Sequence, residues 1–428
     1  MTIIELKEYE KLPPSESNIS QETAAKLKKL ENLILTEQDQ KLKQELQEKK
    51  ILSITSEPLQ KGLRFSAQSH IGVAQFTNFA VTISPKFSNV EKLVELIDYV
   101  YDLDLEIFPE SETEFEGEKD RLSEIIISTF VKKCQKLLRQ GMVKSYNMHE
   151  DNLPYIRGKL LIRQQILNDA HKVLQFVCEH DELEYDNLEN QILLYCLKRC
   201  YYITKNNERK KDIRRLIQNF ADLVKYKEIT LNDFKKINYN QMNFHYRKVH
   251  ELCKLIVNSI RITDFYEQKT RFVNSFFVDM NIVFQKFVYK IFHQYYFPIS
   301  FAIREQQHYK SWRTGDGNII ESIPDILVYD KKKQDIEIII DTKYKDRILE
   351  NDLYQIEHYV RDLGKEEGYA ILPESPDPHT DEYQSIKQKL AIHIRFINID
   401  KMLELIFLKD QIDKKKRIQD ELSKLISI

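Results

Sequence analysis

The strongest structural constraint in this chain is the segment IEIIIDTKYKD, residues 336–346, in which four isoleucines occupy five positions before Asp341. A run of β-branched apolar residues is typical of a strand that is buried on both faces. Asp341 and Lys343 lie two positions apart, so both side chains point to the same face of the strand. The segment therefore predicts a rigid central strand with a carboxylate and an ammonium group at its end.

A second strand is predicted directly upstream, in the segment SIPDILVYD, residues 322–330. A five-residue polar turn, KKKQD, joins it to the isoleucine strand, which predicts an antiparallel hairpin with Asp325 near Asp341. Two adjacent carboxylates repel each other unless a cation or a proton compensates, and Mg²⁺ prefers oxygen ligands. We therefore expect Asp325 and Asp341 to bind Mg²⁺, with Mn²⁺ as a substitute. Lys343 is expected to orient or activate the water that attacks a phosphodiester.

A purely structural alternative exists for this hairpin. With 31% charged residues, an Asp or Glu two positions before a Lys occurs repeatedly by chance, and the hairpin could carry a surface ion pair only. The following helix, NDLYQIEHYVRDLG, favours the functional interpretation because it places Gln355 and Tyr359 on one face. Tyr344 and Lys345, directly after Lys343, are candidates for DNA contact.

A further basic segment lies in the middle of the chain, in NLPYIRGKLLIRQQI, residues 152–166. Arg157, Lys159 and Arg163 could contact phosphates there, or they could form a solvated face. The net charge of the whole chain is only -2, so any nucleic-acid contact must depend on a local patch.

A chain of 428 residues is longer than a typical single domain with one hydrophobic core, so we expect a multidomain α+β protein. Its predicted parts are an N-terminal helical arm (1–50), a small β-rich region with a helix that binds a partner (51–118), a helical middle domain (119–268) and an α/β domain with a mixed sheet (269–428).

The five cysteines lack paired CxxC spacing, and Cys196 and Cys200 are interpreted as buried apolar residues. No signal peptide pattern and no apolar run of about 20 residues is present, so we expect a cytoplasmic protein without membrane contact.

Taken together, Pro324-Asp325, Asp341-x-Lys343 and Gln355 with Tyr359 resemble the PD-(D/E)xK nuclease pattern with its QxxxY-type helix. In more detail, IPDILVYD…IIIDTKYKD…NDLYQIEHYV…GYAILP is similar to the nuclease domain of the McrC family, the DNA-cutting subunit of McrBC-type restriction systems. Upstream, HIGVAQFTNFAVTISPKF and NLPYIRGKLLIRQQI…CEHDELEYDNLENQILLYCLKRC resemble further motifs of that family. The resemblance covers residues 51 to 428.

This resemblance implies a restriction-endonuclease-like C-terminal domain that cleaves double-stranded DNA in anti-phage defence. It implies that Asp325 and Asp341 bind Mg²⁺, that Lys343 serves the attacking water and that Gln355 supports the site. Many nucleases of this class carry a Glu on the first helix of the domain, where this chain has Gln285. Gln285 and Tyr359 are therefore supporting residues in this interpretation.

The resemblance also implies a partner, a hexameric AAA+ GTPase of the McrB type whose hydrolysis the McrC subunit stimulates. The chain contains no G-x-x-x-x-G-K-[ST] motif, so we expect the partner, and not this chain, to bind the nucleotide. Two other functions stay open from the sequence. The chain could be a non-catalytic subunit that binds the motor or DNA, or a nuclease that acts without a motor.

Overall fold

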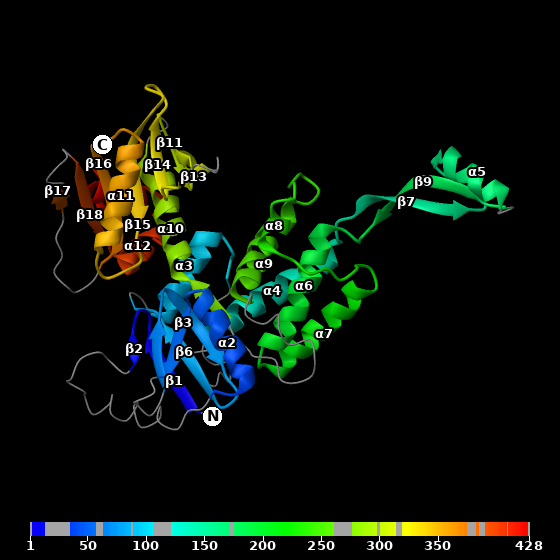
Figure 1. The fold of residues 1–428 in the computed structure, drawn as a ribbon, viewed down its shortest axis with the longest axis horizontal. Coiled ribbons are helices and arrows are strands. Elements are labelled where there is room, and N and C mark those ends of the chain that lie inside the picture. The colour runs from blue at the N-terminus through cyan, green and yellow to red at the C-terminus, as the bar shows by residue number, and fades with distance from the viewer. Residues whose placement is uncertain are drawn as a thin grey trace. The chain divides into compact units, whose positions relative to one another are not determined.

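The computed structural model describes residues 2–12, 35–56, 63–86, 89–105, 121–171, 174–260, 276–297, 300–313, 319–374, 382–384, 390–408 and 410–426. Two compact units make up the chain, and Figure 1 shows their elements. The first unit contains the residues up to Asp102 and those from Phe277 onward, and the second contains most of the residues between them. No helix in the described ranges has the length and apolar character that a membrane crossing requires.

The N-terminal part of the first unit is built from two small sheets and two helices. Its elements are β1 (Thr2–Lys7), β2 (Lys11–Leu12), α2 (Glu37–Glu48), β3 (Leu52–Ser56), β4 (Leu63–Ala67), β5 (His70–Gln75), β6 (Phe79–Ser84) and α3 (Val90–Tyr101). One sheet has the order β2-β4-β3, and the other has the order β1-β6-β5-β10, where β10 is Phe276–Asp279. The β-rich region that the sequence predicts is present, and the chain start adds two strands, β1 and β2, where the sequence predicted a helical arm.

The helical arm predicted for residues 1–50 is described only in part. The described helix there is α2, which Thr36 and Asp39 cap: the Asp39 amide donates to Thr36 Oγ1 at 3.2 Å, and the Thr36 amide donates to Asp39 Oδ2 at 2.9 Å. Residues 13–34, which carry most of the predicted helical pattern, lie outside the described residues.

The C-terminal part of the first unit is a mixed six-stranded sheet with flanking helices. Its elements are α10 (Met280–Ile291), the π-helical turn η4 (Phe292–Tyr296), β11 (Phe301–Glu305), β12 (Tyr309–Arg313), β13 (Ile319–Ser322), β14 (Ile326–Asp330), β15 (Asp335–Thr342), α11 (Glu350–Asp362), β16 (Glu367–Pro373), β17 (Glu382–Gln384), β18 (Ala391–Ile397), α12 (Ile399–Ile406) and α13 (Gln411–Leu425). The order is β11-β14-β15-β16-β18-β17. Neighbours are antiparallel up to β15, parallel from β15 to β18, and antiparallel again at β17. The mixed sheet predicted for this region is confirmed.

Helix α11 packs closely on this sheet. Ile356, Val360 and Tyr359 of α11 join a buried cluster with residues of β14, β15, β16 and β18. A Cβ atom at Gly368 would lie 2.6 Å from Val360 Cγ2, closer than real contacts allow. Glycine at this position therefore lets the helix approach β16, which brings the polar face of α11 to the end of β15.

The second unit consists of a helical part and a β-ribbon. The helical part contains α4 (Arg121–Gln140), α6 (Leu188–Ile203), α7 (Asn207–Ala221), α8 (Leu231–Phe234), the 3₁₀ turn η3 (Phe244–Tyr246) and α9 (Arg247–Ile260). Cys196 and Cys200 are fully buried in it as thiols, as the sequence predicts. Burial raises the pKa of the Cys200 thiol well above its usual value, so this cysteine is an unreactive residue of the hydrophobic core.

The ribbon, which is β7 (Ser145–Leu153), β8 (Lys159–Leu160), α5 (Ile162–Ala170) and β9 (Phe176–Glu184), projects from the helices of its unit (Figure 1). The sequence interpretation described this region as helical and did not anticipate the sheet β7-β9-β8. Its base is held by Asn187 and Asn190, whose Nδ2 atoms both donate to the Val143 carbonyl at 2.9 Å. The asparagines of the NLEN segment therefore anchor the ribbon.

Candidate active site

The two predicted metal-binding carboxylates lie next to each other in the six-stranded sheet. Ile326 of β14 pairs with Ile340 of β15. Because the strands are antiparallel, Asp325, one position before β14, lies next to Asp341, one position after Ile340. The Thr342 amide and hydroxyl both donate to Asp325 Oδ2, at 2.8 and 2.7 Å. The predicted hairpin is thus present, and two hydrogen bonds tie Asp325 to the strand that carries Asp341.

Burial dominates the electrostatics of this pair. Asp341 is only 1% exposed, and burial, followed by the charge of Asp325, raises its pKa to about 7. Burial also raises the pKa of Asp325, against the effect of its hydrogen bonds from Thr342 and of the Lys343 charge. Burial thus disfavours the charged forms of both carboxylates. A bound cation would stabilise these charged forms.

Lys343 lies against this pair and is oriented by α11. Its Nζ is 2.7 Å from Asp341 Oδ2 and donates to Gln355 Oε1 at 2.9 Å. Gln355 Nε2 in turn donates to the Tyr359 hydroxyl at 2.7 Å. Burial lowers the pKa of Lys343, but the charge and hydrogen bond of Asp341, together with the charges of Asp325 and Asp352, raise it by more, so the net pKa is raised. Lys343 is therefore held as an ammonium group in a fixed position.

The first helix of the domain reaches the site through a second glutamine. Gln285 of α10 is 7% exposed, and its Oε1 accepts from Gln306 Nε2 at 3.2 Å. The backbone N–H of Gln306 donates to the backbone carbonyl of Asp325 at 3.0 Å, and the backbone φ of Gln306 is 45°. Gln285 Nε2 is buried without a hydrogen-bond partner among the described residues. Gln285 thus supports the strand end that carries Asp325.

The N-terminal residues contact the segment after Lys343, and sequence reasoning missed them. The Tyr344 hydroxyl donates to Glu8 Oε2 at 3.1 Å, and the Tyr9 hydroxyl donates to the Tyr344 carbonyl at 2.5 Å. The Lys86 amide also donates to Glu8 Oε2, at 3.0 Å, and the Lys86 and Asp346 side chains form an ion pair. Burial raises the pKa of Glu8 to about 8. Lys86 belongs to the segment HIGVAQFTNFAVTISPKF, for which the sequence showed a family resemblance, but nothing in the sequence pointed to Glu8 or to this contact.

The candidate DNA-contacting residues have different surroundings. Tyr344 is 1% exposed, so its predicted DNA contact finds no support, because its hydroxyl and ring are enclosed. Lys345 pairs with Asp352 at 2.7 Å and thereby fixes the start of α11.

The central basic segment belongs to the other unit. Arg157 forms an ion pair with Glu182, and Lys159 pairs with Glu179 at 3.3 Å, while Arg163 is exposed on α5. Two of these three cations thus already have acidic partners on the ribbon.

Comparisons with known proteins agree with this architecture. A family model described as "McrBC 5-methylcytosine restriction system component" matches residues 65–373. A chain from a refined half-complex of the tetradecameric assembly of Thermococcus gammatolerans McrB AAA+ hexamers with bound McrC has a TM-score of 0.55 at 18% identity, covering 99% of this chain and 100% of that one. A chain of the Thermococcus gammatolerans McrBC complex gives a TM-score of 0.43 at 20% identity, over 68% of this chain and 88% of that one. No curated protein matches.

The likeness to the first structure shows that the fold is shared along the length of the chain. The family match is the more specific result, because it spans well over half of the sequence and includes Asp325, Asp341 and Lys343. The protein therefore belongs to the family of McrBC 5-methylcytosine restriction system components.

Proposed function

We propose that this chain is the Mg²⁺-dependent endonuclease subunit of a McrBC-like restriction complex, which acts in the cytoplasm in defence against phage. In this proposal it cleaves phosphodiesters of double-stranded DNA when coupled to an AAA+ GTPase whose hydrolysis it stimulates. The observation that carries the proposal is the convergence of Asp325, Asp341 and Lys343 at the ends of two paired strands, with Gln355 from α11. The strand order around this corner supports a restriction-endonuclease-like domain of the PD-(D/E)xK type.

The donor set fits a Mg²⁺ ion. Asp325 and Asp341 offer hard carboxylate oxygens, and burial raises the pKa of both in the absence of a cation. When bound there, Mg²⁺ would neutralise charge on a scissile phosphate. Thr342 keeps Asp325 in place by its two hydrogen bonds, so the carboxylates do not need to rearrange.

Lys343 is best assigned an electrostatic role. Its ammonium group is held by Asp341 and Gln355, and its raised pKa keeps it protonated. A protonated lysine is a poor general base, but it can donate hydrogen bonds to a water or to a phosphate oxygen. In the proposed reaction Lys343 therefore orients the attacking water and offsets the negative charge that develops on the phosphate.

The proposed partner is a hexameric AAA+ GTPase of the McrB type. This is supported by the fold shared with a chain from an assembly of McrB AAA+ hexamers with bound McrC. The ribbon also exposes large apolar side chains, among them Tyr146, Met148 and Leu174, of the kind that partner proteins cover. The family description supports DNA containing 5-methylcytosine as the substrate of the complex.

A non-catalytic subunit is the second candidate, and Gln285 is the observation that favours it. A neutral amide at this position adds no charge for metal binding, so the site depends on two carboxylates alone. Glu8, although buried, contacts Tyr344 and not the metal-binding pair, so it does not replace the missing charge.

Plasmid cleavage separates the two candidates. Methylated and unmethylated plasmids are incubated with the chain, Mg²⁺ and GTP, with and without the AAA+ partner. Cleavage that needs the partner and disappears in Asp341→Ala supports the nuclease subunit. Cleavage without any partner would contradict the coupling, and partner binding without cleavage by the unmodified chain would favour the non-catalytic subunit.

A further inference from the structure

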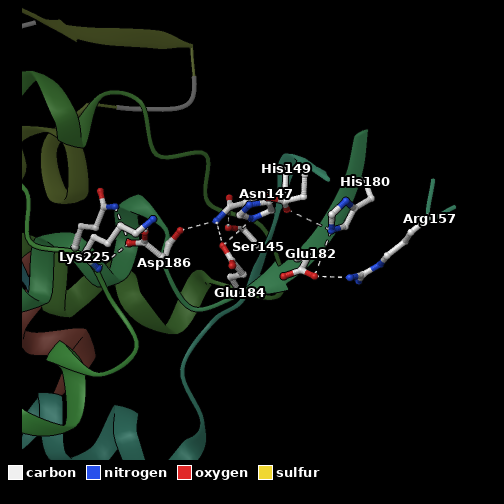
Figure 2. Close-up of polar contacts among 11 residues, drawn as sticks. Ser145, Asn147, His149, Arg157, His180, Glu182, Glu184, Asp186 and Lys225 are labelled. Carbon is white, nitrogen blue, oxygen red and sulfur yellow. Dashed lines mark hydrogen bonds and ion pairs between the residues drawn. The ribbon is translucent and has the colours of Figure 1, made fainter. Parts of the chain in front are cut away.

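The ribbon carries a cluster of histidine and glutamate side chains, residue types that can bind metal ions, far along the sequence from the proposed nuclease site. The register of β7 and β9 pairs Ser145 with Glu184, Asn147 with Glu182 and His149 with His180. Side chains two positions apart on a strand share a face, so these residues line one face of the ribbon. Figure 2 shows His149, His180, Glu182 and Glu184 gathered along this face.

One ligand atom from each of His149, Glu182 and Glu184 lies within 4.8 Å of the other two. In a tetrahedral zinc site with metal–ligand distances of about 2.0–2.1 Å, neighbouring ligand atoms are about 3.3 Å apart. His149 Nε2 lies 3.3 Å from Glu184 Oε2, which already matches this spacing.

The histidine nitrogens supply an independent observation. His149 Nε2 is buried and has no hydrogen-bond partner among the described residues, although Glu184 Oε2 is near it. The His180 side chain is only 4% exposed, its Nε2 is 3.4 Å from Glu182 Oε1, and its Nδ1 is buried without a described partner. Buried polar atoms without partners are costly, and His149 Nε2, which faces Glu184 without a hydrogen bond, is an atom that a bound cation would satisfy.

The carboxylates themselves are already positioned. Asn147 Nδ2 donates to Glu184 Oε2 at 3.0 Å. Arg157 and His180 both contact the same oxygen of Glu182, Oε1. Neighbouring groups that hold ligands in place in this manner tune metal affinity in known sites.

The ribbon also has little else to stabilise it. Within the described residues of β7, β8, α5 and β9, only Val177, Cys178 and His180 are buried. Small elements without a hydrophobic core commonly depend on a disulfide or a metal ion. The Cys178 thiol does not serve this purpose by a disulfide, since it is free and its Sγ accepts from the Arg157 amide at 3.5 Å.

We propose that His149, Glu182 and Glu184 bind one Zn²⁺ ion that cross-links β7 to β9, with His180 as the residue that positions Glu182. Mixed imidazole and carboxylate ligands suit Zn²⁺, whereas Mg²⁺ and Ca²⁺ prefer oxygen ligands alone. The ion joins the middle of β7, at His149, to the last residues of β9, at Glu182 and Glu184, and so holds the two long strands together. This site does not depend on the nuclease activity.

The test uses the full chain with Asp341→Asn, so that the nuclease site contributes little metal binding. The protein is purified under reducing conditions without chelator and titrated with Zn²⁺ by calorimetry, and with Co²⁺ by its visible absorption. We expect one ion per chain. His149→Ala and Glu184→Gln abolish this binding, and His180→Gln lowers the affinity about 10-fold.

Two matched substitutions on the same ribbon serve as controls. Glu150→Gln changes a glutamate on the opposite face of β7, and His171→Ala removes an exposed histidine after α5. Both are expected to bind Zn²⁺ as the parent does. Hydrogen exchange provides a readout apart from affinity: Zn²⁺ should slow exchange of β7 and β9 amides in the parent but not in His149→Ala.

Each contrary outcome overturns the proposal. If the parent binds neither Zn²⁺ nor Co²⁺ stoichiometrically, the cluster is an ordinary network of ion pairs. If His149→Ala binds one Zn²⁺ as tightly as the parent, the ion is held elsewhere, for example by thiols. Neither result would affect the proposed nuclease activity, because plasmid cleavage is measured separately.

Discussion

The hairpin β14–β15 and the ribbon pair β7–β9 are both antiparallel strands that carry carboxylates next to a basic group, yet they differ in burial. Asp341 is enclosed by the six-stranded sheet and α11, and its pKa rises to about 7. Glu182 lies on the ribbon, and its hydrogen bond from Arg157 lowers its pKa. Burial therefore disfavours the charged form of the carboxylate at Asp341, whereas the Arg157 hydrogen bond favours the charged form at Glu182. The difference arises from the surrounding layers and not from the local sequence pattern.

The largest effect is expected at the buried pair. Asp341→Asn should lower plasmid cleavage at least about 10²-fold, because it removes a charged oxygen ligand and leaves the position of Lys343 unsupported. Steady-state cleavage in the presence of the AAA+ partner measures this. Asp335→Asn, on the same strand but exposed and paired with Lys365, is the control and should cleave normally. Equal loss in both variants would mean that folding, and not the site, is affected.

A second prediction concerns the stability of the metal-free protein as a function of pH. The folded-state pKa of Asp341 is about 7 against an ordinary value of 3.8, so the folded state binds more protons between these values. Stability should therefore decrease as the pH rises from about 4 to about 7, by about 2–4 kcal/mol, and this decrease should be weaker in Asp341→Asn.

Denaturant unfolding at a series of pH values measures this slope, and the same series with added Mg²⁺ tests the metal. At pH 8 the ion should stabilise the wild type more than Asp341→Asn, because it compensates the charged pair. A wild type that is most stable above pH 8 without metal would contradict the assigned burial effect.

A third prediction tests the contact between the chain start and the proposed nuclease site. Glu8→Ala leaves the Lys86 amide and the Tyr344 hydroxyl without their acceptor and should destabilise the protein by about 1–3 kcal/mol. Glu8→Gln retains an acceptor oxygen and should be close to wild type at pH 7, because the Glu8 pKa of about 8 means that the carboxyl is largely protonated there.

Cleavage by the Glu8 variants separates stability from positioning. If Tyr344 positions Lys343, Glu8→Ala should lower kcat under conditions in which the protein is fully folded, and Glu8→Gln should rescue it. Identical kcat values in all three proteins would show that the contact serves stability alone.

The smallest effect is expected on the ribbon. Arg157→Ala breaks the ion pair with Glu182 and should leave the thermal unfolding midpoint of the metal-free protein unchanged, because exposed ion pairs contribute little. Differential scanning calorimetry measures this, with Lys159→Ala as a second exposed pair on the same ribbon. A clear loss of stability would show that an exposed ion pair of the ribbon contributes to folding stability, which would contradict the contrast in burial between the two strand pairs.

Local patterns predicted which residues lie together at the candidate active site. Alternation along a strand places Asp341 and Lys343 on one face, a short polar turn places Asp325 beside them, and helical spacing places Gln355 and Tyr359 together. All of these depend on neighbours within a few tens of residues, so the sequence alone was sufficient to assemble them. The burial of Cys196 and Cys200 followed from composition in the same way.

Contacts between distant segments could not be predicted in this way. Glu8 and Tyr344 are 336 positions apart, and strand β1 pairs with β6 across more than seventy residues. The ribbon is a further case, because most side chains of β7 and β9 are polar, and apolar ones such as Tyr146 and Met148 stay exposed and join no core. The cluster of His149, Glu182 and Glu184 exists only because the register joins those strands.

The sequence by itself thus determined the local geometry around Asp325, Asp341 and Lys343, since short-range backbone periodicity is encoded residue by residue. Only the tertiary structure decided that Asp341 is buried enough to titrate near neutral pH, that Glu8 supports the segment after Lys343, and that the ribbon brings histidines and glutamates together. These properties depend on which layers enclose a residue, and that is set by packing over the whole chain.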